Sequence, residues 1–247
     1  MQRYNTMDKK QSLRDAFFRR IPNARKSNPV FRAFFELMYS AHLAAPPGTH
    51  LLNVYSSHDL SGNREEVYRE QFFSACTYEA VDFEKDSFLR DGSAVAGSPH
   101  LLPFSDDSFD ALVTTKIIME HVSDPEKVVS EFARVLKTGG SAFVVAPLVR
   151  RQHQKPYDYF RYTEFGLRHL FEKSGFREIV ITPSNGAMVT LATYAYFFQR
   201  GLIPRRLQFV LDWVDYWIIE PVAFFLDDFD DGYGRDLTLY FMVRAKK

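Results

Sequence analysis

Cysteine is almost absent from this chain, which has one, Cys76, in 247 residues. A single thiol excludes an intramolecular disulfide framework and a thiolate metal cluster, so we expect a protein of the reducing cytoplasm. Long hydrophobic runs are absent too: the longest uncharged one, residues 186–199, is shorter than the ~20 residues of a membrane-spanning helix. Residues 1–10 contain no apolar signal-peptide core. We therefore expect a soluble protein without stable membrane insertion.

Net charge is also lacking, because 31 basic residues balance 31 acidic ones. No overall field would draw the protein to nucleic acid, which is therefore not an expected partner. The charge is nevertheless uneven: residues 1–32 are mainly basic and residues 212–236 mainly acidic. Two interpretations stay open, namely oppositely charged solvated faces, or attraction between the two segments within or between subunits.

Aromatic residues are abundant by contrast, at 16% of a chain long enough for one large core domain with additions. The pattern divides the chain into four segments. They are a basic arm with a lid or packing helix (1–47), a core (48–182), a helical insertion (183–236) and a final core strand (237–247). Within them we expect helices over residues 30–45, 63–73 and 164–174, and strands over residues 50–55, 78–83, 93–96, 109–114, 142–146, 177–182 and 237–244.

The most informative stretch is an ordered set of short motifs between residues 101 and 140. It contains Leu-Pro-Phe at 102–104 and an acidic loop, then Phe-Asp at 109–110, Glu-His at 120–121, Asp-Pro at 124–125 and Arg-Val-Leu-Lys-Thr-Gly-Gly at 134–140. Ser123, with Glu126 three residues later, is expected to cap a helix that has Pro125 in its first turn. Gly139 is expected to end that helix.

This ordered set resembles the common pattern of the class I S-adenosylmethionine-dependent methyltransferases. An unrelated Rossmann-like domain is the alternative, since each motif by itself is weak. The resemblance implies an α/β fold with a Rossmann-like sheet of seven strands, mainly parallel, with helices on both faces and the last strand antiparallel. It also implies S-adenosylmethionine as the cofactor, bound in a crevice beyond the carboxyl ends of the strands.

The resemblance implies a set of cofactor contacts, in which Asp82 at the end of the second strand accepts hydrogen bonds from both ribose hydroxyls. A solvated strand end is the other interpretation of Asp82. The implied contacts are Asn53, Tyr55, Ser57, Asp82, Ser98, Leu102 and Thr115.

Two positions depart from the family pattern. Relatives have a Gly-x-Gly-type turn after the first strand, where glycine lets the backbone approach the cofactor. This chain has Tyr55 there, and its nearest glycine is Gly62, so the tyrosine ring could fill the methionine or ribose position. Relatives also often have Gly-Asp before the Leu-Pro-Phe turn, where this chain has Gly97-Ser98, and a serine accepts without charge assistance. These departures put cofactor affinity in question.

Candidate acceptor residues follow the fourth and fifth strands. His121 is a candidate base, with a core or capping histidine as the plainer interpretation. Residues 151–163 resemble the H-x-x-P-x-D-[YW]-x-R-[YF]-T stretch of a subgroup of these enzymes, where it borders the acceptor pocket. The resemblance makes His153 and Asp158 catalytic candidates and Tyr157 and Arg161 candidates for substrate contact. A structural hydrogen-bond knot is the alternative, and no metal site is expected.

Two functional hypotheses follow. The first is a methyltransferase acting on a hydroxyl or carboxyl of a small-molecule or glycan-like acceptor; the second is a binding or regulatory protein whose cofactor site has decayed. A nicotinamide dehydrogenase is disfavoured because no G-x-G-x-x-G follows the first strand.

The insertion is expected to pack its many large apolar residues on the core as a helical lid over the crevice, with a possible homodimer contact. Membrane docking is disfavoured at this stage, because anionic lipid would repel the acids of the insertion. These acids are Asp212, Asp215, Glu220, Asp227 and Asp228.

Overall fold

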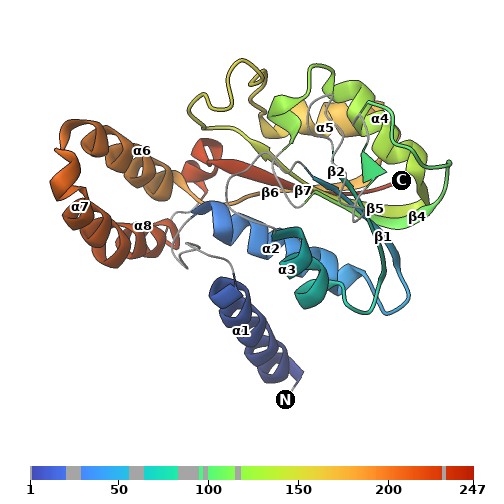
Figure 1. Cartoon of the computed structure of the whole chain (residues 1–247), viewed down its shortest axis with the longest axis horizontal. Coiled ribbons are helices and arrows are strands. Elements are labelled where there is room, and N and C mark those ends of the chain that lie inside the picture. The colour runs from blue at the N-terminus through green and yellow to red at the C-terminus, as the bar shows by residue number, and fades with distance from the viewer. Residues whose placement is uncertain are drawn as a thin grey trace.

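A seven-stranded sheet with helices on both faces forms the centre of the protein, shown in Figure 1. The computed structural model describes residues 2–20, 29–55, 64–82, 95–96, 100–114, 118–229 and 232–247. The strands are β1 (His50–Tyr55), β2 (Thr77–Asp82), β3 (Val95–Ala96), β4 (Phe109–Val113), β5 (Leu136–Pro147), β6 (Arg177–Pro183) and β7 (Tyr240–Lys246). Their order is β3-β2-β1-β4-β5-β7-β6, and only β7 runs antiparallel to its neighbours. This confirms the predicted fold class.

The helices lie in two layers and one projecting lobe (Figure 1). They are α1 (Gln2–Arg20), α2 (Pro29–Ala44), α3 (Arg64–Phe72), α4 (Pro125–Val135), α5 (Glu164–Lys173), α6 (Ala187–Leu202), α7 (Gln208–Val214) and α8 (Glu220–Asp227). A π-helical turn, η3 (Asp215–Ile219), joins α7 to α8, and three short 3₁₀ helices are η1 (Met119–His121), η2 (Arg205–Leu207) and η4 (Tyr233–Leu237). Among the described residues, no helix has the length and apolar character that crossing a bilayer requires.

The sheet separates two hydrophobic cores because successive strand residues point to opposite faces. Leu52 belongs to the core shared with α4 and α5, whereas its neighbour Leu51 belongs to the core shared with α2 and α3. Phe132 of α4 and Met38 of α2 are fully buried, one in each core. The helix over residues 30–45 is thus a packing helix on the sheet rather than a lid.

Arg134 links the motifs of the central stretch in space. Its guanidinium donates to the carbonyl oxygens of Leu102 at 2.9 Å and Phe104 at 2.7 Å, and to Asp106 at 2.8 Å. Glu131 pairs with Arg134 and accepts from the Leu102 backbone N–H at 2.8 Å. The Arg134 hydrogen bond holds the pKa of Glu131 below its usual value. The Leu-Pro-Phe turn is therefore fastened to α4, which explains why the two motifs occur together.

Several predicted boundaries are wrong. Asp124, not Ser123, caps α4 by accepting from the Lys127 backbone N–H. Gly139 does not end that helix, because the chain turns extended at Leu136 to pair with Phe109 of β4. The final strand begins at Tyr240 instead of residue 237, since Leu237 ends the 3₁₀ helix η4. The shift at Gly139 arises from pairing with a distant strand, which local pattern does not report, whereas the shift of the cap from Ser123 to Asp124 is local.

The basic arm contains a helix that the sequence pattern did not predict, α1. Phe17 is fully buried and Phe18 is 7% exposed, and both pack on Phe35 of α2. Arg20 of α1 forms a salt bridge with Glu70 of α3. Two adjacent aromatic residues thus dock a helix whose remaining sequence is largely polar.

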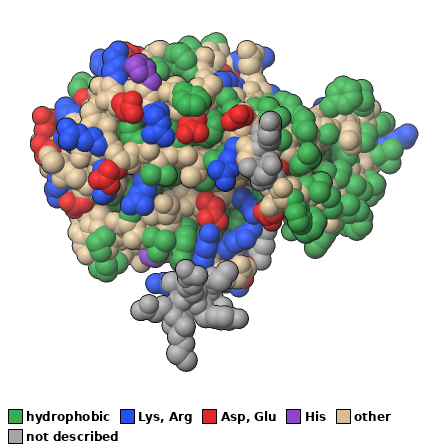
Figure 2. Space-filling model, turned by 180° about the vertical axis from the view of Figure 1, so that it is seen from behind, with side chains coloured by type: hydrophobic (Ala, Val, Ile, Leu, Met, Phe, Trp, Pro, Cys, Tyr) green, Lys and Arg blue, Asp and Glu red, His purple; other side chains and the backbone are tan. Residues whose placement is uncertain are grey.

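The insertion projects from the sheet as a helical hairpin, which we call the apolar lobe (residues 187–229). Figure 2 shows its surface as an almost continuous hydrophobic area. Trp213 is 58% exposed and Trp217 61% exposed, whereas Leu211 and Ala223 are buried. The expectation that the large residues of the insertion pack on the core is therefore wrong for most of them, and the two tryptophans do not close over the rest of the molecule as a lid.

One prediction concerns Gly140, which lies within β5. A Cβ on Gly140 would lie 2.8 Å from the carbonyl oxygen of Lys137 and 3.1 Å from that of Asp110, both of them backbone atoms. We expect Gly140→Ala to lower the free energy of unfolding by about 1–3 kcal/mol, as overpacking does. Gly201→Ala is the control, because no atom lies within 4 Å of its added Cβ, and it should be neutral or slightly stabilising. Urea denaturation of both variants measures this, and equal stabilities would contradict it.

Candidate functional site

The carboxyl ends of the parallel strands meet at one edge of the sheet, where the cofactor crevice was predicted. Tyr55 ends β1 and pairs in register with Asp82, the last residue of β2. Asp82 is only 5% exposed, so the interpretation of a solvated strand end is wrong. Asn53 lies fully buried inside β1, paired with Ala80 on one side and Val113 on the other.

The remaining predicted cofactor contacts divide into two groups. Ser57, Ser98 and Thr115 lie outside the described residues, so they stay predictions. Leu102 is 2% exposed and packs in the core under α4, while its backbone N–H and C=O bind Glu131 and Arg134. Those contacts give Leu102 a structural role, and a direct cofactor contact is not supported for it.

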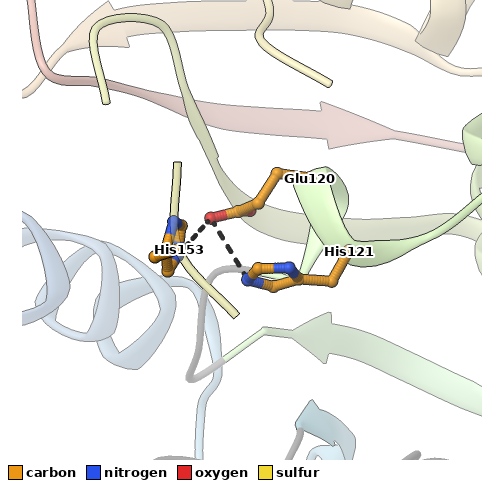
Figure 3. A group of neighbouring side chains, drawn as sticks. All are labelled: Glu120, His121 and His153. Atoms are coloured by element: carbon orange, nitrogen blue, oxygen red, sulfur yellow. Dashed lines mark ion pairs between the residues drawn. The ribbon is translucent and has the colours of Figure 1, made fainter. Parts of the chain in front are cut away.

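The segments after β4 and β5 bring the two predicted histidines, His121 and His153, together with Glu120, as Figure 3 shows. Glu120 and His121 lie on η1, and His153 lies on the loop that follows β5. The two imidazole rings have centroids 4.8 Å apart. The Nε2 atoms of His121 and His153 lie 3.7 Å and 3.5 Å from the same oxygen, Glu120 Oε1. The structure thus joins two candidate bases that are far apart in the sequence.

Burial dominates the electrostatics of this cluster. Glu120 is fully buried, which raises its pKa to about 7. Desolvation, followed by the nearby positive charge of Arg150, lowers the pKa of His153 to about 4. Burial also lowers the pKa of His121. At neutral pH both imidazoles are therefore uncharged, the form in which histidine accepts a proton or binds a metal.

Asp158 and Arg161 form a hydrogen-bonded knot beneath the same loop. The Asp158 carboxylate accepts from Arg161 at 2.6 Å and 2.9 Å and from the His153 backbone N–H at 2.8 Å. Arg161 also donates to the carbonyl oxygens of Arg150 and Arg151. Paired mainly with Arg161, Asp158 has a pKa well below its usual range. The structure thus supports the knot interpretation for these two residues, while Tyr157 is 43% exposed and accepts from His121 through its backbone oxygen.

The helix α6 of the apolar lobe borders this loop through Phe197. The Arg151 guanidinium lies over the ring of Phe197 on α6, 4.6 Å from its centroid. Arg150 hydrogen-bonds the hydroxyl of Tyr240 at the start of β7. The side chain of Phe197 on α6 therefore flanks the candidate acceptor site, although the two tryptophans of the lobe are exposed.

Sequence reasoning missed Glu120 and Arg150 as members of the site. In the sequence Glu120 is marked only as half of a Glu-His pair, and no motif marks Arg150. Their positions in the sequence were the available signal. Glu120 follows β4 and Arg150 follows β5, and the carboxyl ends of both strands lie at the crevice. Their burial depends on packing between segments and could not be predicted from that signal.

Part of the chain is similar in sequence to known methyltransferases. A family model described as a methyltransferase domain matches residues 60–144. The demethylmenaquinone methyltransferase of Renibacterium salmoninarum is 32% identical over 109 residues, covering 41% of this chain and 43% of that protein. The demethylmenaquinone methyltransferase of Thermotoga maritima is 36% identical over 75 residues, covering 29% of this chain and 32% of that protein. The chain thus aligns with less than half the length of either relative.

Solved structures show the same fold at low identity. A SAM-dependent methyltransferase from Archaeoglobus fulgidus superposes with a TM-score of 0.53, covering 87% of this chain and 94% of that chain at 12% identity. The fold, the matched domain and the ordered motifs agree with one another. Residues 60–144 thus match a methyltransferase domain, and the chain has the fold that its resemblance to the class I S-adenosylmethionine-dependent methyltransferases implies.

Proposed function

We propose that the protein transfers a methyl group from S-adenosylmethionine to a hydroxyl or carboxyl of a small-molecule or glycan-like acceptor. One observation carries the proposal: a buried carboxylate, Asp82, ends β2 at the same sheet edge from which His121 and His153 emerge after β4 and β5. A cofactor site and a base site at one edge are what methyl transfer needs. The names of the curated relatives support a small-molecule acceptor.

The chain's own residues have separable roles in this proposal. When bound, S-adenosylmethionine supplies an electrophilic methyl group on a sulfonium, which an acceptor oxygen displaces in line. Asp82 would hold the ribose hydroxyls through two charge-assisted hydrogen bonds. His121 or His153 would take the acceptor proton at Nε2, because the Nδ1 of each faces a backbone carbonyl oxygen. The ionised carboxylate of Glu120, which faces both Nε2 atoms, would stabilise the resulting imidazolium.

Binding of S-adenosylhomocysteine tests the cofactor part of the proposal. At ~100 times its dissociation constant, this ligand should stabilise the fold by about 2.7 kcal/mol. For a chain of this size the melting temperature should rise by about 5–10 °C. Calorimetric titration gives the dissociation constant independently. No heat and no melting shift at saturating ligand would contradict the proposal.

The alternative function, a methyltransferase-like binding protein with a decayed cofactor site, rests on Tyr55. This residue stands where relatives have glycine, at the carboxyl end of β1 beside Asp82. If the ring obstructs the site, Tyr55→Gly should restore or strengthen binding of S-adenosylhomocysteine, while Tyr55→Phe should not. If the wild type binds and Tyr55→Gly binds more weakly, the ring contributes a contact and the alternative is excluded.

A further inference from the structure

The two histidines of the site have defined tautomers. His121 Nδ1 lies 2.6 Å from the backbone oxygen of Tyr157, and His153 Nδ1 lies 3.3 Å from that of Arg151. A carbonyl oxygen only accepts, so each Nδ1 carries a hydrogen and donates it. In the neutral imidazole the proton is then absent from Nε2, which presents a lone pair.

Both lone pairs point at a carboxylate that has no donor. The two Nε2 atoms face Glu120 Oε1, and Glu120 is fully buried. Neither carboxylate oxygen of Glu120 receives a hydrogen bond from any residue that the structure describes. Three electron-rich atoms therefore converge with no donor between them, an arrangement that is unfavourable until a cation or a proton occupies the gap.

We propose that Glu120, His121 and His153 bind a divalent transition-metal ion of the zinc type. Two imidazole nitrogens and one carboxylate oxygen are a ligand set that zinc takes at catalytic sites. Ligands ~2.1 Å from a tetrahedral zinc lie ~3.4 Å from one another. The two Nε2–Oε1 distances, 3.7 Å and 3.5 Å, are close to this value, and all three ligand atoms lie within 4.8 Å of one another. The Nδ1 hydrogen bonds to backbone oxygens are the outer-shell contacts that orient metal-binding histidines. Magnesium and calcium prefer oxygen ligands, so we expect them to bind poorly.

The residues around the cluster indicate which further ligand the metal would bind. The side chains of His121 and His153 remain 13% and 23% exposed, which leaves one side open to a further ligand. Arg150 and Arg161 both lie near Glu120, and Asp158 compensates only Arg161. An anionic oxygen is therefore the expected fourth ligand. On the proposed function, this would be the deprotonated hydroxyl or the carboxylate of the acceptor. With the metal bound, the Nε2 atoms of His121 and His153 would be ligands and not bases, and the metal would promote loss of the acceptor proton by lowering its pKa.

Metal titration tests the site without cofactor or acceptor. Chelator-stripped protein should bind one Zn²⁺ by calorimetry, and Co²⁺ should give a visible spectrum without thiolate charge transfer. His121→Ala, His153→Ala and Glu120→Gln should each lower Zn²⁺ affinity by at least about 10–100-fold. His169→Ala, an exposed histidine on α5, is the matched control and should bind as the wild type does.

Two results would overturn the metal site. One is failure of the stripped wild type to bind Zn²⁺, and the other is Zn²⁺ binding that survives all three ligand substitutions. Circular dichroism of each variant identifies loss of folding, and Glu120→Gln keeps the side-chain volume if the alanine variants unfold. Because the titration uses no S-adenosylhomocysteine, the metal site and the proposed methyl transfer can fail independently.

The apolar lobe carries a second inference, on separate observations. Its exposed large side chains together present an apolar area on the order of 1,000 Å², more than the ~300–600 Å² of a typical monomer's largest patch. They are Met188, Leu191, Phe198, Leu202, Leu207, Phe209, Val210, Trp213, Trp217, Ile218, Val222, Phe225, Leu226 and Phe229. Such a surface needs a partner.

The acids of the lobe do not oppose a lipid partner, because other contacts engage them. Asp227 accepts from the backbone N–H groups of Gly186 and Met188 at the start of α6. Asp212 pairs with Arg200 and accepts from the Tyr196 hydroxyl, and Asp215 is buried.

The other two acids, Glu220 and Asp228, lie near Arg32 of α2, at the base of the lobe. The opposite end of the hairpin carries Arg205 and Arg206, which are exposed and have no ion-pair partner within the described part of the chain. Charge on the free end of the lobe is therefore positive.

We infer that the apolar lobe docks on the surface of an anionic lipid bilayer. The exposed Trp213 and Trp217 are amphipathic rings typical of membrane interfaces, and Arg205 and Arg206 complement anionic headgroups. The 16 residues of α6 span ~24 Å, less than the ~30 Å hydrocarbon core, so the lobe would lie in one leaflet. A bilayer also surrounds an inserted hairpin, so it would contact apolar side chains on more than one face of the lobe.

Vesicle co-sedimentation of the full chain tests this docking. Phosphatidylcholine vesicles containing phosphatidylglycerol should sediment the protein, and pure phosphatidylcholine vesicles should do so more weakly. Trp213→Ser with Trp217→Ser, and separately Arg205→Glu with Arg206→Glu, should each lower partitioning by at least about tenfold. Leu101→Ser, which replaces an exposed leucine outside the lobe, is the control and should not change it. Absence of vesicle binding, or a stable dimer in solution that the tryptophan variant disrupts, would overturn the inference.

Discussion

Replacement of Asp82 by alanine is expected to weaken the binding of S-adenosylhomocysteine by at least about 100-fold. Asp82 is 5% exposed at the carboxyl end of β2, where a carboxylate can accept from both ribose hydroxyls. Each charge-assisted hydrogen bond contributes about 1.5–3 kcal/mol, so the loss of two corresponds to a factor of ~100 or more. Asp82→Asn keeps one acceptor oxygen without its charge and should bind with intermediate affinity.

Calorimetric titration measures the effect, and Glu79→Ala is the matched control. Glu79 lies on the same strand, but its carboxylate meets His50 at 2.6 Å rather than the crevice. The control should bind the ligand as the wild type does. If Asp82→Ala retains full affinity while the wild type binds, the ribose is held elsewhere, and the role that the family resemblance assigns to Asp82 is wrong.

Arg161→Ala is expected to lower the free energy of unfolding by about 3–5 kcal/mol. The substitution leaves Asp158, whose side chain is 3% exposed, without the two guanidinium donors that compensate its buried charge. It also releases the carbonyl oxygens of Arg150 and Arg151. Arg161→Lys should recover part of the loss, because an ammonium restores the charge without the bidentate geometry. Urea denaturation gives the free energies.

The pH dependence of stability provides an independent check on this knot. The pKa of Asp158 is lowered in the folded protein, so the pair stabilises the fold above the unfolded value of ~3.9. That stabilisation is lost as the pH falls below ~4. Asp158→Asn should remove this part of the acid sensitivity while leaving the affinity for S-adenosylhomocysteine nearly intact. An unchanged acid profile in Asp158→Asn, together with a fully stable Arg161→Ala, would show that the pair is not structural.

The sequence by itself determined the sheet, because its strands are marked by local pattern. β1 has the predicted bounds, His50–Tyr55, and the antiparallel last strand follows from the family resemblance. The helix starting at Pro125 was also predictable, since the helical spacing of its apolar residues and the proline at its start are local signals. Local signals were insufficient at Gly139, where pairing of Leu136 with Phe109 ended the helix earlier.

Only the tertiary structure decided how charges and histidines are used. The sequence predicted His121 and His153 as separate candidates, and the packing of two loops placed both beside the buried Glu120. The sequence counted the acids of the insertion as a barrier to lipid, whereas the fold engages Asp212 and Asp227 within the lobe. Burial and the pairing of distant residues arise when remote segments pack together, so composition and periodicity along the chain do not specify them.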